Sequence, residues 1–195
     1  MYGLGGQLAV LCPEKQAVLS TIADTRLDPV GVQRIYNAFF EEIYPWIGQE
    51  DMEEKEYHLQ IPALQSPWQS PLPETGVYVF PQGNQLGMKK LRLKENLLIY
   101  ENARGRAELP FQVGSVLQAP YPGWPQVPAL VSGGWIAEGQ LRIRCFAVGH
   151  APCGFDMLLS FTGDFVTVQC RKSHDPVTEG YDGVASGALA QDAEI

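Results

Sequence analysis

The stretch Leu141-Arg-Ile-Arg-Cys-Phe-Ala-Val148 decides the fold class, because it alternates along its whole length. Its odd-numbered positions carry Leu, Ile, Cys and Ala, and its even-numbered positions carry Arg, Arg, Phe and Val. Such a period of two is typical of a β-strand. Two further apolar runs, 155–161 and 165–170, flank Thr162-Gly163-Asp164, which predicts a tight hairpin. Residues 132–172 are therefore expected to form three successive antiparallel strands.

Short strand-like runs also precede this stretch. They are separated by turn-forming residues such as Gln82-Gly83-Asn84 and Lys94-Glu95-Asn96. The runs cover residues 77–80, 88–93, 97–100, 107–113, 115–118 and 129–136. About eight or nine short strands with no helical pattern among them indicate a mainly β fold, an antiparallel up-and-down barrel or a sandwich. The loop Pro120-Tyr-Pro-Gly-Trp-Pro125 interrupts this rhythm, and we expect it to close one end of the barrel.

The N-terminal part has a different pattern. Two apolar runs, 6–12 and 17–22, are joined by Pro13-Glu14-Lys15-Gln16, which suits a surface turn and predicts a β-hairpin. An amphipathic helix is expected next, with Asp28 as its N-cap, Pro29 in its first turn and Pro45 at its end. Its apolar stripe consists of Val32, Ile35, Tyr36, Phe39, Phe40, Ile43 and Tyr44.

These patterns divide the chain into four parts. Residues 1–47 hold the hairpin and helix, and residues 48–74 are expected to form a linker that is acidic at first and then rich in proline. The barrel is expected over 75–173. Residues 174–195 are rich in Gly, Ala and Asp and predict a surface tail with little structure of its own.

Composition narrows the classes of partner. The 195 residues include 22 acidic and 14 basic ones, which gives a net charge of -8 and disfavours binding to nucleic acid or anionic lipid. No apolar run is long enough for a membrane span and no secretory signal is seen, so a cytoplasmic location is expected. The four cysteines lie in or beside apolar runs and are expected to be reduced and buried.

Residues Tyr2-Gly-Leu-Gly-Gly-Gln-Leu through Asp24 resemble the last strands of the catalytic domain in serine β-lactamase-like hydrolases. This superfamily contains the penicillin-binding proteins, the class C lactamases and related esterases. Its members have a glycine-rich strand start, a strand, a Pro-Glu turn, another apolar strand and a long C-terminal helix in this order. The resemblance covers residues 2 to about 47. It implies that Gly5, Gly6 and Gln7 are a remnant of the active-site edge, whereas a plain glycine-rich turn is the alternative.

The remainder is similar to the lipocalin-like (calycin-like) barrel appended to many members of that superfamily. The similar segments are Gly76-Val-Tyr78, Asn84-Gln-Leu-Gly-Met88, Gly133-Gly-Trp135 with Leu141-Arg-Ile143, and 161–168. They are strand and turn signals, so the resemblance implies a barrel shape rather than a chemistry.

The catalytic motifs of the superfamily are not found in the sequence. No serine has a lysine three residues later, and Tyr100-Glu-Asn102 matches Tyr-x-Asn at the end of a predicted barrel strand, where we interpret it as chance. We therefore expect a non-catalytic C-terminal portion of a serine hydrolase, without cofactor or metal. The hairpin and helix would bind an N-terminal catalytic half, or a second copy of this chain.

A free-standing barrel that binds a small apolar ligand is the alternative. Tyr78, Trp124, Trp135, Arg142 and Arg144 would then line a cavity, with arginine binding a carboxylate. The competing interpretation is that the barrel is filled by its own side chains and that the arginines face water.

One pair of residues has a spacing that zinc ligands use. His150 and Cys153 are three positions apart, but no second close pair faces them. We therefore interpret His150 as a loop histidine rather than as a metal ligand.

Overall fold

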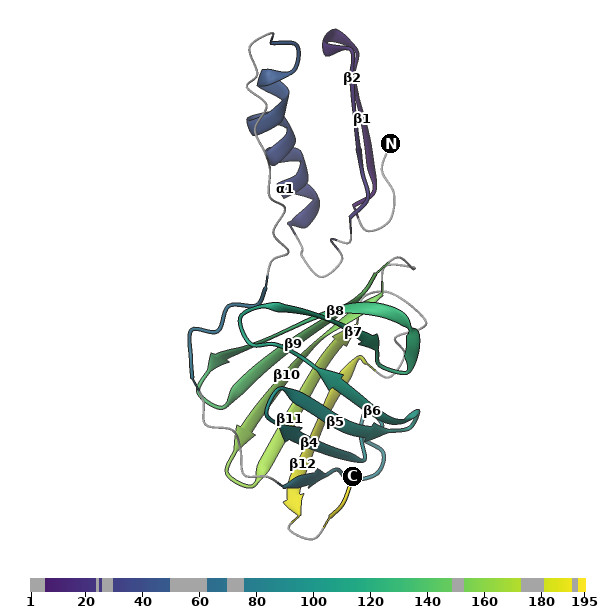
Figure 1. Ribbon diagram of the computed structural model, residues 1–195, viewed down its shortest axis with the longest axis vertical. Helices are drawn as coiled ribbons and strands as arrows, with labels where there is room; N and C mark the ends of the chain where they lie inside the picture. The colour runs from purple at the N-terminus through teal and green to yellow at the C-terminus, as the bar shows by residue number, and fades with distance from the viewer. Residues whose placement is uncertain are drawn as a thin grey trace. The chain divides into compact units, whose positions relative to one another are not determined.

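The computed structural model describes residues 6–23, 25, 30–49, 63–69, 76–148, 153–172, 181–190 and 193–195. The chain divides into two compact units, Met1–Leu59 and Gln60–Ile195. The fold is mainly β, as predicted. The first unit contains a two-stranded sheet and helical turns, and the second contains a nearly closed antiparallel barrel (Figure 1).

The first unit begins with the expected hairpin. Strands β1 (Leu8–Cys12) and β2 (Ala17–Thr21) pair in antiparallel register across the short 3-10 turn η1 (Pro13–Lys15). Gln16 closes this turn with a left-handed φ of 49°, and its N–H donates to the carbonyl oxygen of Pro13 over 3.0 Å.

The helix of the first unit changes its winding along its length. It consists of α1 (Gly31–Asn37), the π-helical segment η2 (Ala38–Ile43) and the 3-10 turn η3 (Tyr44–Trp46). The expected cap residues Asp28 and Pro29 lie outside the described residues. Pro45 sits in the first turn of η3, where its missing N–H breaks no helical hydrogen bond.

Two polar contacts of described residues join the helical segments to the turn of the hairpin. The Tyr44 hydroxyl donates to Glu14 Oε1 over 2.5 Å, and Lys15 Nζ donates to the carbonyl oxygen of Ile47 over 3.1 Å. Among the described helical side chains of the apolar stripe, Phe39 is the one that is fully buried.

The second unit is an up-and-down barrel. Its ten-stranded sheet has the order β6-β5-β4-β3-β12-β11-β10-β9-β8-β7, so chain neighbours pair along most of the sheet and β12 returns to pair with β3. The strands are β3 (Val77–Val79), β4 (Lys90–Lys94), β5 (Leu97–Asn102), β6 (Gly105–Pro110), β7 (Val116–Tyr121), β8 (Trp124–Ala137), β9 (Gln140–Ala147), β10 (Gly154–Thr162), β11 (Phe165–Lys172) and β12 (Gly183–Ala190). The barrel thus has one or two strands more than expected.

The ladder is interrupted between β6 and β7, and both edges are protected. On β6 the exposed side chains of Arg106 and Glu108 form an ion pair of 2.9 Å, and charged side chains discourage pairing with another strand. On β7, Pro120 lacks the N–H that a further strand would need.

Two predictions about this unit were wrong. Residues after 174 do not form a structureless tail, because 183–190 form β12 inside the sheet. Small residues fit there because Ala185 faces the core, and a side chain on Gly187 would lie 3.0 Å from the ring of Phe80. The segment 120–125 is no end-closing loop either, since Tyr121 and Trp124 pair across a tight turn that joins β7 to β8.

Residues 63–69, within the predicted linker, lie along β8, and we call them the strap. The Leu64 N–H donates to Ser132 Oγ over 2.8 Å, and the Trp135 N–H donates to Ser66 Oγ over 3.0 Å. A side chain on Gly134 would lie 2.5 Å from the carbonyl oxygen of Gln65. The strap therefore needs glycine at that position of β8 for its close approach.

Candidate functional site

The residues predicted as an active-site edge have a structural explanation. Gly6 has a φ of +91°, which favours glycine, and its carbonyl oxygen accepts a hydrogen bond of 3.1 Å from the hydroxyl of Thr21. The same hydroxyl oxygen accepts the N–H of Leu8 over 3.2 Å. Gln7 is exposed, and Gly5 lies outside the described residues. The two described residues thus form the entry to β1.

Three of the predicted cavity residues face the barrel interior or its rim. Tyr78 on β3 and Trp135 on β8 are buried, and each packs on the ring of Phe161, with centroid distances of 5.8 and 6.3 Å. Trp124 is partly buried and packs against the core at the turn between β7 and β8. The structure therefore brings Tyr78 and Trp135 together around one ring.

Described side chains pack closely in the barrel interior. Residues on β4, β5, β6, β8, β9, β10 and β11 contribute inward side chains with 0% exposure, namely Leu91, Leu98, Tyr100, Leu109, Val127, Ala129, Val131, Leu141, Ile143, Cys145, Phe155, Leu159, Val166 and Val168. A space large enough for water would leave accessible surface on its lining, so no such space borders these side chains. The alternation predicted for 141–148 is confirmed at Leu141, Ile143 and Cys145.

A group of aromatic rings inside the barrel carries buried hydroxyls. Phe155 stacks on Tyr181 with centroids 4.3 Å apart and contacts Tyr121 edge to face. The hydroxyls of Tyr100 and Tyr181 lie 2.5 Å apart in a hydrogen bond. The hydroxyl of Tyr121 is buried and finds no hydrogen-bond partner among the described residues. The Tyr100-Glu-Asn102 match is therefore part of the core, with Tyr100 bonded to another tyrosine.

Burial keeps these groups neutral. It raises the pKa of Tyr181 to about 12 and raises the pKa values of Tyr100 and Tyr121 as well. Burial likewise raises the pKa values of the Cys145 and Cys170 thiols. A thiol that stays protonated is a poor nucleophile and a poor metal ligand.

The cysteines are free and buried, as predicted. Within the residues that the structure describes, no group of three or more His, Cys, Asp or Glu side chains is arranged to hold a metal ion. His150, which has the spacing of a zinc ligand relative to Cys153, lies outside the described residues.

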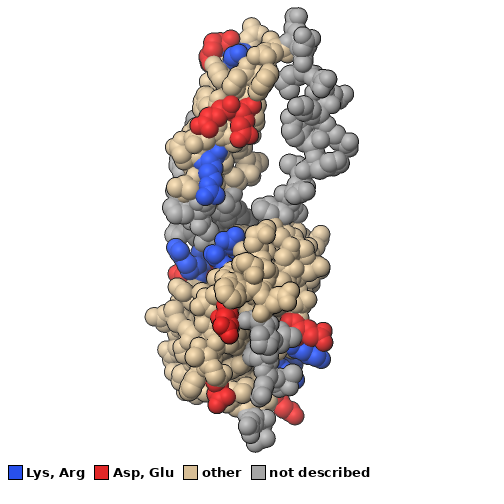
Figure 2. All heavy atoms as spheres, turned by 90° about the vertical axis from the view of Figure 1, so that its left-hand side faces the viewer, with Lys and Arg blue, Asp and Glu red and all other residues tan. Residues whose placement is uncertain are grey.

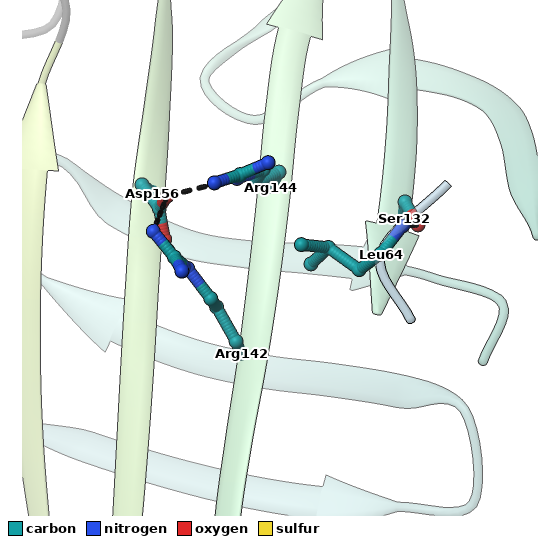
Figure 3. A network of polar contacts seen from close by, with 5 residues as sticks. All are labelled: Leu64, Ser132, Arg142, Arg144 and Asp156. Carbon is teal, nitrogen blue, oxygen red and sulfur yellow. Dashed lines mark hydrogen bonds and ion pairs between the residues drawn. The ribbon is translucent and has the colours of Figure 1, made fainter. Parts of the chain in front are cut away.

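The two predicted arginines face outward, so the cavity expectation is wrong for them. Arg142 and Arg144 on β9 both bind Asp156 on the neighbouring strand β10 (Figure 3). Arg142 makes a bidentate contact, with Nε 2.8 Å from Oδ1 and Nη2 2.6 Å from Oδ2. Arg144 Nε donates to Oδ2 over 2.9 Å. The hydrogen bonds to Asp156 raise the pKa of Arg142, against an opposing effect of its partial burial.

Sequence reasoning missed Asp156, Ser132 and Leu64 as members of this arrangement. The signal for Asp156 was present, because it alternates with the apolar Phe155 and Met157 and must face outward with the arginines of β9. No sequence signal places Leu64 beside β8, since that contact joins segments 68 residues apart.

No model of a known protein family and no curated protein matches the sequence. In the described part of the chain, no helix is long and apolar enough to cross a membrane.

Proposed function

We propose that this chain has a structural, non-catalytic role in a serine hydrolase related to the β-lactamases. The hairpin and helix would join the sheet of a catalytic half, and the barrel would be an accessory domain beside it. The sequence motifs of the N-terminal part support this assignment, together with the absence of a Ser-x-x-Lys motif.

The observation that carries the proposal is the incomplete burial of the hairpin. Leu11 and Val18 are 71% and 65% exposed, although both belong to paired strands, and neither β1 nor β2 contains a charged residue. A two-stranded sheet of this kind gains little stability alone and is typical of a segment that pairs with further strands.

The filled barrel supports a structural role over ligand storage. An apolar ligand would need the space that the inward side chains occupy, and displacing them would cost packing energy. The alternative of a free-standing ligand-binding barrel is therefore the weaker one.

Two measurements test the proposal. The purified chain is incubated with a fluorescent penicillin and with a fluorophosphonate probe, and we expect no labelled serine by mass spectrometry. A single stoichiometrically labelled serine would overturn the non-catalytic role. The proposal also predicts an in-frame or adjacent coding segment with Ser-x-x-Lys upstream of Met1, and a gene without one would contradict the link to a hydrolase.

Light scattering tests the alternative of self-association. If the hairpin pairs with another copy of this chain, the protein elutes as a dimer, and Leu11→Lys with Val18→Lys shifts it to a monomer. The proposal expects a monomer in both cases, because the partner is a different polypeptide segment.

A further inference from the structure

Strand register gathers charged groups on the outer face of the barrel. Arg144 is paired with Asp156 across β9 and β10, and Arg142 lies two residues earlier on the same face of β9. On the other side of β10, Arg171 of β11 is paired with Asp156. Asp182 directly precedes Gly183, which pairs with Cys170, so Arg171 has a second acidic residue close to it. The surplus of positive charge therefore lies on β9.

Among the described residues, Arg142 and Arg144 share one carboxylate, that of Asp156, which leaves one positive charge unbalanced there. Their side chains are 36% and 42% exposed, whereas Asp156 is 11% exposed and faces the two guanidinium groups. The residues paired with them on β8, Gly134 and Ser132, are uncharged. This surplus stands out in a protein of net charge -8. In Figure 2 uncharged side chains predominate on the visible described surface, among separate groups of Lys or Arg and of Asp or Glu.

The two guanidinium groups keep unused donors. A guanidinium has five N–H donors in a fixed fork. Arg144 uses its Nε on Asp156, and neither of its terminal nitrogens has a hydrogen-bond partner among the described residues. Arg142 uses Nε and Nη2, which leaves Nη1 without a partner in the same part of the chain. In the described part of the chain, each guanidinium group therefore has one edge whose N–H donors are available to a ligand.

The arginines are also held in place before any ligand arrives. Asp156 fixes both at Nε, and the strap contacts Ser132, the β8 residue paired with Arg144. Leu64 points from the strap toward β9 at the level between Arg142 and Arg144 (Figure 3), and it is 8% exposed. The Leu64 N–H is fixed by Ser132 Oγ over 2.8 Å. Ordering long side chains in advance lowers the entropy that binding must remove.

We propose that Arg142, Arg144 and the adjoining strap form a docking surface for an extended acidic segment of a partner protein. Residues two apart in a strand project from the same face about 6–7 Å apart. A partner strand with carboxylates two residues apart matches this spacing, and each carboxylate accepts hydrogen bonds from one free guanidinium side. The surface lies on the barrel and does not depend on the hydrolase assignment.

The test uses the full chain and a synthetic peptide with Glu at alternate positions and fluorescein at one end. We expect binding at about 20 mM salt that weakens as the ionic strength rises to about 0.3 M, because screening shortens the reach of the charges. Arg144→Gln is expected to raise Kd at least fivefold. Arg106→Gln is the matched control, since Arg106 is also an exposed strand arginine paired with a carboxylate, and it should leave Kd unchanged.

Further variants and ligands separate charge from geometry. Arg144→Lys keeps the charge without the fork and should bind with intermediate Kd. Amide spectra of each variant establish that the barrel is folded. Equal affinity of Arg144→Gln and the unmodified chain overturns the proposal, as does a lack of binding to the peptide at low salt. It is also overturned if inorganic phosphate binds the same arginines as tightly as the peptide does, since the surface would then be a general anion site.

Discussion

The barrel and the hairpin-helix unit differ in how completely their strands bury apolar side chains. In the barrel, pairing continues from strand to strand and returns to β3, so inward residues such as Leu141 and Phe155 have no exposure. In the described part of the first unit, the hairpin and one helical segment form no closed core, and Leu11, Val18 and Ile22 remain exposed. Apolar strands thus provide a complete core only when enough of them enclose a common interior.

The largest expected effect is a contrast between matched core and hairpin substitutions. Phe155→Ala should lower the free energy of unfolding of the barrel by about 3–5 kcal/mol, because the ring is fully buried between Tyr121 and Tyr181. Leu11→Ala should change it by less than about 0.5 kcal/mol. Urea denaturation measures both. A large loss for Leu11→Ala would mean that the exposed hairpin face is covered in the isolated chain.

The next largest effect should be a loss of barrel stability at alkaline pH that the hairpin unit does not share. Burial raises the folded-state pKa of Tyr181 to about 12, above its ordinary value near 10, so the unfolded chain loses this proton first. The stability from Tyr181 is complete below about pH 10 and is lost as the pH rises through 12, by roughly 2–3 kcal/mol. Cys145 and Cys170, whose pKa values are also raised, start this loss near their ordinary pKa of 9. Urea denaturation from pH 7 to about 12 measures it.

The hairpin unit gives the control for this titration. Tyr44 also has a raised pKa, through its hydrogen bond to Glu14, but it belongs to the first unit and is only half-buried. Its ionisation should therefore leave barrel unfolding unchanged, which Tyr44→Phe tests. Constant barrel stability up to a pH of about 12 would contradict the burial of the tyrosine group.

A smaller loss is expected where the strap meets the barrel. Gly134→Ala places a Cβ 2.5 Å from the backbone oxygen of Gln65, so the strap must shift, at about 1–3 kcal/mol. Hydrogen exchange should also become faster at the Trp135 N–H, which donates to Ser66 Oγ. Gln65→Ala is the control, because it leaves the backbone oxygen in place. Unchanged exchange at Trp135 would show that the strap contact contributes little.

The smallest effect should have the opposite sign. Tyr121→Phe removes a buried hydroxyl that has no partner in the described part of the chain, so stability should stay unchanged or rise by up to about 1 kcal/mol. Tyr181→Phe instead breaks the bond to Tyr100 and should lower stability by about 1 kcal/mol. Calorimetry measures the stability of both variants and so distinguishes the two expected effects. A clear loss for Tyr121→Phe would point to a bound water at its hydroxyl.

Sequence periodicity predicted most of this fold and little of the site. Alternation located the inward side of β9, and turn residues located most strands, because both depend on local geometry. Strand β12 was missed because its small residues lack the usual strand signal, although they suit the close approach to Phe80. The predicted cavity role of Arg142 and Arg144 was wrong. Which face of a strand points into the barrel depends on the side toward which the whole sheet curves and closes. The hydrolase resemblance stays a prediction.

The pairing of β3 with β12 has a consequence for how the barrel assembles. Every other strand pairing described in this unit joins strands adjacent in the chain, whereas Val79 meets Ala188 across most of the unit's sequence. Closing such a long loop costs more entropy than forming a hairpin, so this contact should form last and set the folding rate. A circular permutant of the barrel unit alone, with residue 195 joined to residue 76 by a short linker and with new ends between Pro110 and Val116, would convert it into a local contact, and should therefore fold faster into the same structure.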